Sequence, residues 1–232
     1  MDLAGKKVII TGVSSGIGKS LVEQYLEKGS IVCGLGRTDP TISNVNFTFL
    51  KTDIRNFNEV EHSISKFLKN HEGIDILINN AGMGSFGPVE DYSIDEIHEM
   101  FETNVYGTLY TIKLAVPIMK LKGRGHIINI SSTAGIEGYP QVSVYGATKF
   151  AVKAISQSMY KELRDFGIKV TCVYPGSTKT DFFKNIDAIV PHDYMLMPKE
   201  VASMIVQATE TSDNFHQVNI EVRPLRPKGP AK

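Results

Sequence analysis

The segment Val8-Ile9-Ile10-Thr11-Gly12-Val13-Ser14-Ser15-Gly16-Ile17-Gly18 decides the fold class of this chain. Its first three residues form a short apolar run, typical of a strand that is buried on both faces of a parallel sheet. After the glycine turn, apolar residues recur at helical spacing as far as Leu26, and Gly29 is a stop signal. A buried strand that leads directly into an amphipathic helix predicts the first half of a βαβ unit.

The same alternation of strand and helix continues along the rest of the chain. Short apolar runs predict six further strands, at residues 31–33, 47–49, 76–78, 127–130, 170–173 and 218–222. Helices are predicted after capping-box patterns at Asn56/Glu59 and Ser93/Glu96, at 94–117 with an end or kink near Pro117, at 143–166, and after Pro198. Because crossovers of this kind are right-handed, we expect one parallel α/β sheet with helices on both faces.

The composition indicates a single domain with no special partner class. No shift in composition divides the chain, so we predict one domain over residues 1–222, including a substrate loop at 181–197. The Pro-containing end, 223–232, is expected to be a loose tail. The 25 Lys and Arg residues balance 25 Asp and Glu residues, and this zero net charge argues against a dedicated nucleic-acid binder.

The cysteines and the apolar runs exclude further classes. Cys33 and Cys172 lack CxxC spacing, so neither a disulfide framework nor a structural zinc site is predicted, and we expect no metal. No apolar run approaches the ~18 residues that span a bilayer, and the first residues contain no apolar signal core. We therefore expect a cytoplasmic protein without a membrane partner.

The glycine turn itself predicts a binding function. Its spacing is G-x-x-x-G-x-G, and it lies between the first strand and the first helix. Small residues at this place let the backbone approach a pyrophosphate, to which the helix N-terminus offers N–H donors and a positive dipole end. The pattern favours dinucleotide binding, although any tight strand-to-helix turn tolerates glycines.

Arg37 bears on which dinucleotide is bound. An acid that holds the ribose is expected about 20 residues beyond the turn, but the count from Gly16 reaches Gly36 and Arg37. An arginine there can pair with a 2′-phosphate, which favours NADP(H) over NAD(H). Two alternatives stay open, because Arg37 can equally be a solvated surface residue and Asp39 can serve a ribose hydroxyl.

Tyr145 and Lys149 form a candidate catalytic pair. They lie four residues apart on a predicted helix, separated by about 6 Å of helix rise on one face. A nearby ammonium favours a tyrosinate and so is expected to lower the phenol pKa, making Tyr145 a general acid or base. Ser132 follows the fifth strand, where a hydroxyl can donate to the same substrate oxygen. Such a pair is commonly a solvated neighbour pair, but the surrounding stretch is nearly uncharged, which predicts burial.

At this point the sequence resembles the short-chain dehydrogenase/reductase family, in its single-domain form of about 250 residues. The resemblance covers about residues 5–222 and rests on motifs in a fixed order. These are Thr11-Gly12-x-x-x-Gly16-x-Gly18, Asp53 with Ile54, Asn79-Asn80-Ala81-Gly82, Asn104, Ser132, Tyr145-x-x-x-Lys149 and Pro175-Gly176-x-x-x-Thr180. The resemblance implies a Rossmann-type, doubly wound sheet of seven parallel strands in the order 3-2-1-4-5-6-7.

The resemblance also implies roles for individual residues. Tyr145 would exchange the proton, Ser132 would polarise the substrate oxygen, and Lys149 would bind the nicotinamide ribose and lower the Tyr145 pKa. Asn104 would hold a water of a proton relay, or it would only bond backbone groups at a helix bend. The implied cofactor-binding residues are Gly12, Ser14, Ser15, Gly16, Ile17, Gly18, Arg37, Asp53, Ile54, Asn80, Ala81, Gly82, Tyr145, Lys149, Pro175, Gly176, Thr178 and Thr180.

Two departures concern the substrate end. The residues after the last strand lack the family's G-G loop, and the segment between Thr180 and Pro198 is short. Apolar residues there and nearby suggest an apolar pocket, although each also suits core or lid packing: Met83, Phe86, Tyr139, Phe182, Phe183, Ile186, Tyr194, Met195 and Met197. We assign Ser132, Tyr145, Met83 and Phe182 to the substrate. The tail's Arg and Lys residues are interpreted as a solvated end.

The sequence thus predicts an NADP(H)-dependent oxidoreductase that moves hydride between nicotinamide and a carbonyl or alcohol of a small molecule. The alternatives are an NAD(H)-dependent alcohol dehydrogenase of the same family and a non-catalytic protein that senses a dinucleotide. The resemblance implies a homodimer or homotetramer built through helices 94–117 and 143–166. Small residues at Ala147, Ala151, Ala154 and Ser158 suit close helix approach, within the chain or between chains.

Overall fold

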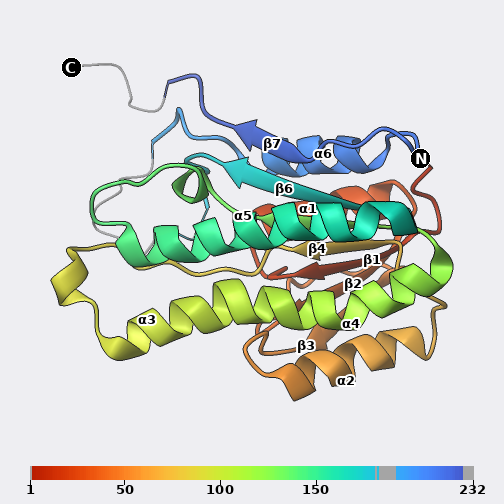
Figure 1. Cartoon of the computed structure of the whole chain (residues 1–232). Coiled ribbons are helices and arrows are strands. Elements are labelled where there is room, and N and C mark those ends of the chain that lie inside the picture. Colours follow the sequence, from red (N-terminus) through yellow and green to blue (C-terminus); the bar gives the residue numbers. More distant parts are fainter. Residues whose placement is uncertain (1, 181, 183–191, 227–232) are drawn as a thin grey trace.

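Seven parallel strands form one sheet in the computed structural model, which describes residues 2–180, 182 and 192–226. The strand order is β3-β2-β1-β4-β5-β6-β7, which confirms the predicted fold class (Figure 1). The strands are β1 (Lys7–Thr11), β2 (Ile31–Gly36), β3 (Phe47–Lys51), β4 (Ile76–Asn79), β5 (Gly125–Ile130), β6 (Ile168–Pro175) and β7 (Asn219–Val222). Each predicted apolar run falls on one of these strands.

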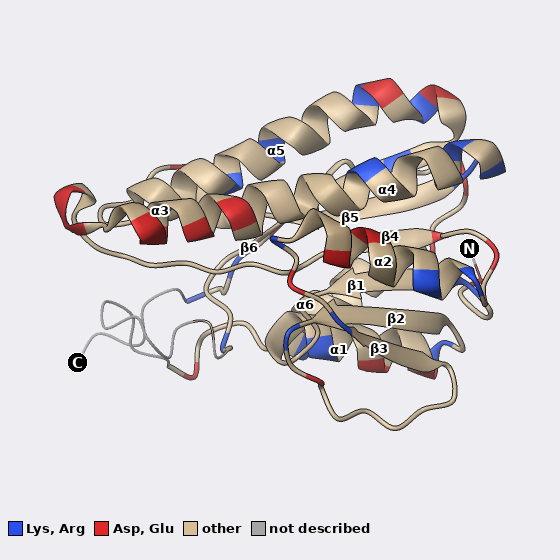
Figure 2. Cartoon of the chain, turned by 90° about the horizontal axis from the view of Figure 1, so that it is seen from below, with Lys and Arg blue, Asp and Glu red and all other residues tan. Residues whose placement is uncertain are grey.

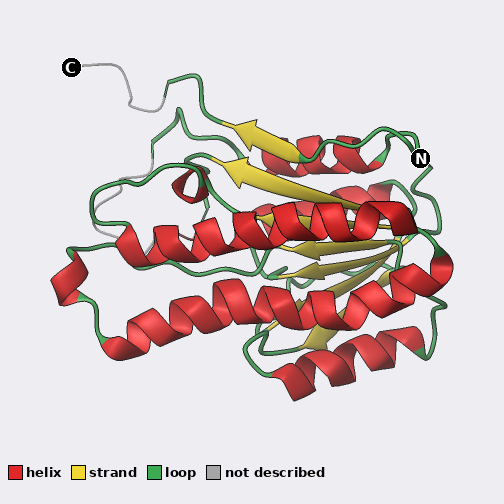
Figure 3. Ribbon diagram, in the orientation of Figure 1, coloured by secondary structure: helices red, strands yellow, loops and turns green. Residues whose placement is uncertain are grey.

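Helices cover both faces of the sheet (Figure 3). They are α1 (Gly16–Glu27), α2 (Phe57–Leu68), α3 (Ile94–Phe101), α4 (Gly107–Lys122), α5 (Ser143–Leu163) and α6 (Pro198–Thr209). One apolar core joins α1 and α6 to the sheet, and a second joins α2, α4 and α5 to the opposite face. No helix within the described ranges is long and apolar enough to cross a membrane.

The strand order reverses between β1 and β4, and this reversal positions the site. β1 pairs with β2 on one side and with β4 on the other. The chain adds β2 and β3 on one side of β1 and then crosses back from β3 to add β4 on the other side. In sheets of this type a ligand crevice opens outside the carboxyl ends of the strands at the point of reversal. The glycine turn follows β1 directly and therefore lies at that point.

The helix starts largely follow the capping signals in the sequence. Ser93 and Glu96 form a reciprocal capping box at the start of α3, as predicted. At α2 the Asn56 side chain accepts from the N–H groups of Asn58 and Glu59, but the Glu59 carboxylate accepts from the Asp53 N–H instead of the Asn56 N–H. The cap is therefore present, and its carboxylate holds the end of β3 in place.

The prediction of one helix at 94–117 is wrong in two respects: the observed helix ends later, and it is interrupted. A π-helical turn at residues 102–106 separates α3 from α4, and α4 continues through Pro117 to Lys122. Pro117 is exposed, so the carbonyl that loses its partner four residues earlier can be solvated. The helix ends instead at Gly123, whose φ of +65° is the left-handed conformation that glycine adopts readily.

The other long helix and the chain end also differ in detail from the prediction. The helix predicted at 143–166 is α5 followed by a 3-10 turn at Arg164–Phe166. The predicted tail begins with residues that the structure describes, and Arg223 forms hydrogen bonds there. The remainder of that tail, 227–232, lies outside the described residues.

Candidate active site

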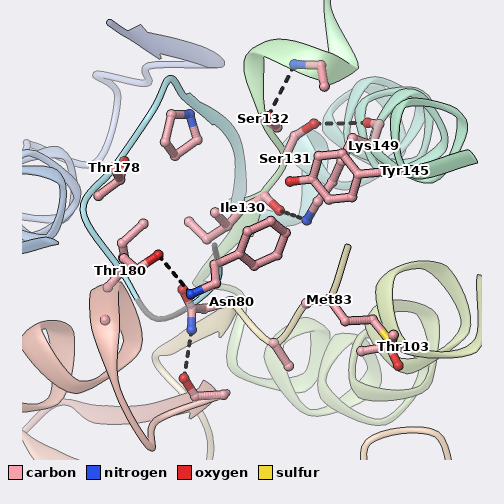
Figure 4. A pocket seen from close by; sticks show the side chains of 18 of the residues that line it. Asn80, Met83, Thr103, Ile130, Ser131, Ser132, Tyr145, Lys149, Thr178 and Thr180 are labelled. Carbon is pink, nitrogen blue, oxygen red and sulfur yellow. Dashed lines mark hydrogen bonds between the residues drawn. The ribbon is translucent and has the colours of Figure 1, made fainter. Parts of the chain in front are cut away.

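A cleft of about 930 Å³ opens at the carboxyl edge of the sheet (Figure 4). Among the predicted site residues, all except Gly18 and Asn104 line it. These lining residues are Gly12, Ser14, Ser15, Gly16, Ile17, Arg37, Asp53, Ile54, Asn80, Ala81, Gly82, Met83, Ser132, Tyr145, Lys149, Pro175, Gly176, Thr178, Thr180 and Phe182. In the described part of the chain, no three His, Cys, Asp or Glu side chains gather in a way that could hold a metal ion.

The glycines let the turn pack closely against the backbone that follows β4. Gly12 has a φ of +70°, and a Cβ atom on it would lie 2.7 Å from the Ala81 Cα. A Cβ atom on Gly18 would overlap the Gly12 carbonyl oxygen and would lie 2.5 Å from the Asn80 Nδ2. Gly18 is therefore required for α1 to pack closely on the turn, although it does not line the cleft.

Hydrogen bonds join the ends of β1 and β4 beneath this turn. The Thr11 hydroxyl oxygen accepts from the N–H groups of Asn80 and Ala81, at 3.0 and 2.9 Å. The Asn80 amide donates to the Thr11 and Gly12 carbonyls, at 3.0 and 2.9 Å. These bonds fix the turn in a conformation in which the N-terminus of α1 faces the cleft. The turn thus fits a dinucleotide, whose pyrophosphate such a helix end would bind.

Arg37 and Asp39 are placed differently with respect to the cleft. Arg37 lines it and is exposed. The Asp39 carboxylate accepts from the Thr41 N–H at 2.7 Å, within a turn where Thr41 has a φ of +58°. Asp39 does not line the cleft. Of the two residues that the sequence offered for the ribose end of the cofactor, Arg37 lines the cleft and Asp39 does not.

Asp53 has an ion-pair partner that the sequence did not reveal. Both carboxylate oxygens of Asp53 bind the Arg55 guanidinium, with the shortest bond 2.7 Å from Nη2. This pair lowers the Asp53 pKa, and Arg37 contributes to the shift. Arg37, Asp53 and Arg55 all line the cleft, and Arg55 also pairs with Glu99 at 3.0 Å. The Arg55 charge is therefore shared between two carboxylates.

Tyr145 and Ser132 meet at the other end of the cleft. Tyr145 lies on α5 and is 7% exposed. Burial raises the pKa of the phenol to about 12, and a hydrogen bond with the Ser132 side chain opposes this rise. Ser132 also accepts from the Ala134 N–H at 3.1 Å, which orients its hydroxyl group. Without a bound cofactor, the Tyr145 phenol is therefore a weak acid, and it already forms a hydrogen bond with the Ser132 hydroxyl.

Lys149 lies on the same helix and is 4% exposed. Its ammonium group donates to the Ile130 carbonyl at 3.0 Å, as the dashed line in Figure 4 marks. Burial lowers the Lys149 pKa to about 8. The ammonium lies 5.7 Å from the Tyr145 ring centroid. The expectation that Lys149 lowers the Tyr145 pKa is therefore not met in the chain by itself, because burial of the phenol dominates.

Asn104 lies behind the cleft wall, in the π-helical turn 102–106. Its side-chain oxygen accepts from the Met83 N–H at 2.9 Å, and its amide donates to the Met83 carbonyl and to the Thr148 hydroxyl. The Thr108 hydroxyl donates to its main-chain carbonyl at 2.9 Å. These bonds hold the loop after β4 against α5. The predicted part of Asn104 in a proton relay remains a prediction.

The apolar wall of the cleft is smaller than predicted. Phe86 and Phe182 lie 5.4 and 5.6 Å from Tyr145, measured between ring centroids, and Met83 packs in the same cluster. Among the other predicted residues, Tyr139 lines the cleft, whereas Tyr194, Met195 and Met197 do not. Met195 is instead buried, as expected if this residue packs in the core and does not line the pocket. Phe183 and Ile186, within the predicted loop 181–197, lie outside the described residues.

The chain also places two polar residues on the cleft that the sequence interpretation missed, Glu137 and Arg223. They form hydrogen bonds with each other and with Tyr139, and all three residues line the cleft. Arg223 was interpreted as part of a solvated end of the chain, and it is exposed, but it also pairs with Glu137 at the cleft. Its position directly after the last strand was the one available signal, since the carboxyl ends of parallel strands share an edge.

The fold and the cleft define an α/β protein of the Rossmann nucleotide-binding type. The model of the short chain dehydrogenase family matches residues 6–190, and the chain belongs to this family. An uncharacterized oxidoreductase of Staphylococcus aureus (strain MW2) is 34% identical over 231 residues, which cover 96% of this chain and 99% of that protein. The chain is thus a short-chain dehydrogenase, an oxidoreductase of the type that acts on CH–OH groups.

Solved structures show the same architecture. A serine dehydrogenase complexed with NADP+ has a TM-score of 0.85 and 27% identity, over 97% of this chain and 98% of that chain. ElxO with NADP bound has a TM-score of 0.83 and 29% identity, over 94% and 97%. A 3-ketoacyl-(acyl-carrier-protein) reductase from Brucella melitensis, with a TM-score of 0.90 at 23% identity over 97% and 100%, shares the fold.

Proposed function

We propose that this protein interconverts an alcohol and a carbonyl compound of small size, with NADP(H) as the preferred cofactor. The observation that carries the proposal is the convergence of Ser132, Tyr145 and Lys149 at one end of a cleft whose other end is the glycine turn. When bound, the nicotinamide supplies or accepts the hydride at the reacting carbon. Two similar structures, the serine dehydrogenase and ElxO, hold NADP+ or NADP, which supports a nicotinamide dinucleotide here.

Three residues would handle the proton and the substrate oxygen. Tyr145 gives its proton to the carbonyl oxygen in reduction and takes a proton from the alcohol in oxidation. Ser132 already hydrogen-bonds the phenol, so it can hold the substrate oxygen at the same place. Lys149, on the same helix, would bind the ribose hydroxyls and add positive charge beside the phenol. The buried surroundings of Tyr145 strengthen each of these interactions, because little water screens them.

The preference for NADP(H) rests on the charges at the glycine-turn end. Arg37 faces the cleft, and Arg55 pairs with Asp53, so a 2′-phosphate would meet the Arg37 guanidinium beside a carboxylate that is already paired. The Asp39 carboxylate, which a ribose 2′-hydroxyl would need, is engaged with the Thr41 N–H. This arrangement supports NADP(H) over NAD(H).

A substrate panel tests the proposal. The purified protein is given NADPH with ketones and aldehydes, or NADP+ with alcohols, and absorbance of the reduced nicotinamide is followed. We expect turnover with at least one class and a lower KM for NADPH than for NADH. Tight nucleotide binding without turnover across the panel would refute the proposal and would support a dinucleotide sensor. Equal KM values for the two nucleotides would refute the cofactor preference.

We also propose a homodimer or homotetramer formed through α4 and α5, in a cytoplasmic protein. Tyr106, Leu109 and Phe150 are 38–49% exposed on these helices, and Ala147 and Ala154 are exposed beside them. Most of each ribbon between the helix ends is uncharged (Figure 2). An apolar face of this kind, lined by small residues, suits packing against a second copy.

A further inference from the structure

Part of the cleft is lined by polar residues that hydrogen-bond one another. Glu137 belongs to the loop between β5 and α5, and Arg223 directly follows β7. An ion pair of 2.7 Å joins Glu137 Oε1 to Arg223 Nη2 and so links segments that are far apart in the sequence. The Tyr139 hydroxyl donates to the same Glu137 oxygen. All three residues line the cleft, and we refer to them as the polar wall.

The hydrogen bonds of the polar wall leave one acceptor available. The Arg223 Nε donates to Glu221, its Nη2 to Glu137, and its Nη1 to the Tyr139 hydroxyl at 3.4 Å. Both bonds that Glu137 accepts fall on Oε1. Within the described part of the chain, Glu137 Oε2 has no hydrogen-bond partner, and the side chain is 49% exposed.

The negative charge of the polar wall lies on Glu137 and its positive charge on Arg223, which also pairs with Glu221 outside the cleft. The bonds from Tyr139 and Arg223 lower the Glu137 pKa, so this carboxylate stays ionised at neutral pH. Arg223 donates one N–H from each of its three nitrogens to these partners, which holds the guanidinium in place against Glu137.

The apolar residues around Tyr145 come from other segments of the chain. Phe86 and Phe182 flank Tyr145, and Met83 packs with them. These residues come from the loop after β4 and from the segment after β6, whereas the polar wall comes from the loop after β5 and the end of β7. A substrate whose oxygen reaches Tyr145 therefore meets apolar groups on one side and a carboxylate on another.

We propose that Glu137 selects substrates that carry a hydrogen-bond donor, an ammonium or a hydroxyl group, at a distance from the reacting carbon. Arg223 holds the carboxylate in place, and Oε2 accepts from the donor. This proposal rests on the proposed function, since it concerns the substrate of the same cleft.

A matched substrate series tests the selection. The members are secondary alcohols with a methyl group on the carbinol carbon and a short methylene chain that ends in methyl, hydroxyl, ammonium or carboxylate. For the wild-type protein we expect kcat/KM to be about tenfold higher for the best donor-bearing member than for the methyl member, the size of one charge-assisted hydrogen bond. The carboxylate member carries no donor and is expected to have a lower kcat/KM than the ammonium member. Comparing the hydroxyl and ammonium members shows which of the two donor groups Glu137 prefers.

Two variants that each remove one negative charge test whether Glu137 causes the difference in kcat/KM. Glu137→Gln should raise KM for the ammonium member about tenfold and leave the methyl member unchanged. Glu221→Gln is the matched control, because Glu221 contacts the same guanidinium but does not line the cleft. Equal kcat/KM for all four members, or equal losses in the two variants, would overturn the proposal.

A binding measurement keeps this proposal separate from the proposed function. The ammonium and methyl alcohols are titrated calorimetrically into the protein with NADP+, which needs no turnover. Tighter binding of the ammonium member that Glu137→Gln abolishes would support the selection even if no alcohol is oxidised. Turnover of the series without any such difference would overturn the selection and leave the oxidoreductase activity standing.

Discussion

Acid should destabilise this protein through His126, a residue far from the cleft. His126 lies on β5 and is 2% exposed, and its Nε2 lies 2.8 Å from the Thr171 hydroxyl oxygen. That hydroxyl donates to the Gln217 carbonyl, so it accepts from the Nε2–H of His126. Within the described chain, the His126 Nδ1 has no hydrogen-bond partner. A second proton on the ring would therefore be buried without an acceptor, near the His216 ring at 6.0 Å.

The magnitude follows from the pKa. Burial, aided by His216 and Lys169, lowers the His126 pKa from 6.5 to about 3. The unfolded chain binds this proton below about pH 6.5, whereas the folded chain does not until about pH 3. Stability is therefore fully present above pH 6.5 and falls as the pH drops through this window. Linkage gives a loss of about 2 kcal/mol between pH 7.5 and 5, within an upper limit of about 5 kcal/mol.

Urea unfolding at pH 7.5, 6 and 5 measures this loss. His126→Gln keeps an N–H donor for Thr171 and removes the titration, so its unfolding free energy should fall about 2 kcal/mol less than that of the wild type. His62→Gln, on the exposed side of α2, is the control and should follow the wild type. The same pH dependence in His126→Gln and the wild type would refute the reasoning.

Three further predictions concern the cofactor and the assembly. Arg37→Ala should raise KM for NADPH about tenfold and change KM for NADH little; an unchanged ratio would count against a phosphate contact. Gly18→Ala should weaken nucleotide binding more than tenfold, measured by fluorescence titration, because its Cβ would overlap the Gly12 carbonyl oxygen, whereas Gly138→Ala meets no atom within 4 Å. Ala154→Glu should reduce the mass measured by light scattering, and Ser65→Glu on exposed α2 should not; a wild type with the mass of one chain would contradict the proposed assembly.

Local patterns were sufficient to predict the strands, whereas their order in the sheet came from the family resemblance. The apolar runs were clearest for β1, β2, β4, β5 and β6, which are mostly buried, while β3 and β7 at the sheet edges are partly exposed. Pro117 misled the prediction, because an exposed position tolerates the lost hydrogen bond within a helix. The break fell instead at a π-helical turn around Asn104, whose bonds to Met83 join segments distant in the sequence.

The site residues that belong to a sequence motif were predicted. The contacts that form only where two distant segments meet were not. Asp53 was identified, but its pairing with Arg55 depends on side-chain geometry. Arg223 was missed because only the fold brings the end of β7 to Glu137. The Tyr145 pKa was expected to fall, but without a bound cofactor it rises, because the phenol is buried. The spacing of Tyr145 and Lys149 in the sequence does not show how deeply the phenol is buried.

Tyr145→Phe tests the central claim most directly. The substitution removes one hydroxyl group from a buried ring and leaves the glycine turn untouched. With any substrate that the wild type turns over, we predict that kcat/KM falls by about a hundredfold or more, the contribution of a positioned general acid, while the Kd for NADPH stays within about twofold. Tyr160→Phe, on the same helix away from the cleft, should behave as the wild type. Turnover by Tyr145→Phe near the wild-type rate would contradict the assignment of Tyr145 as the proton donor.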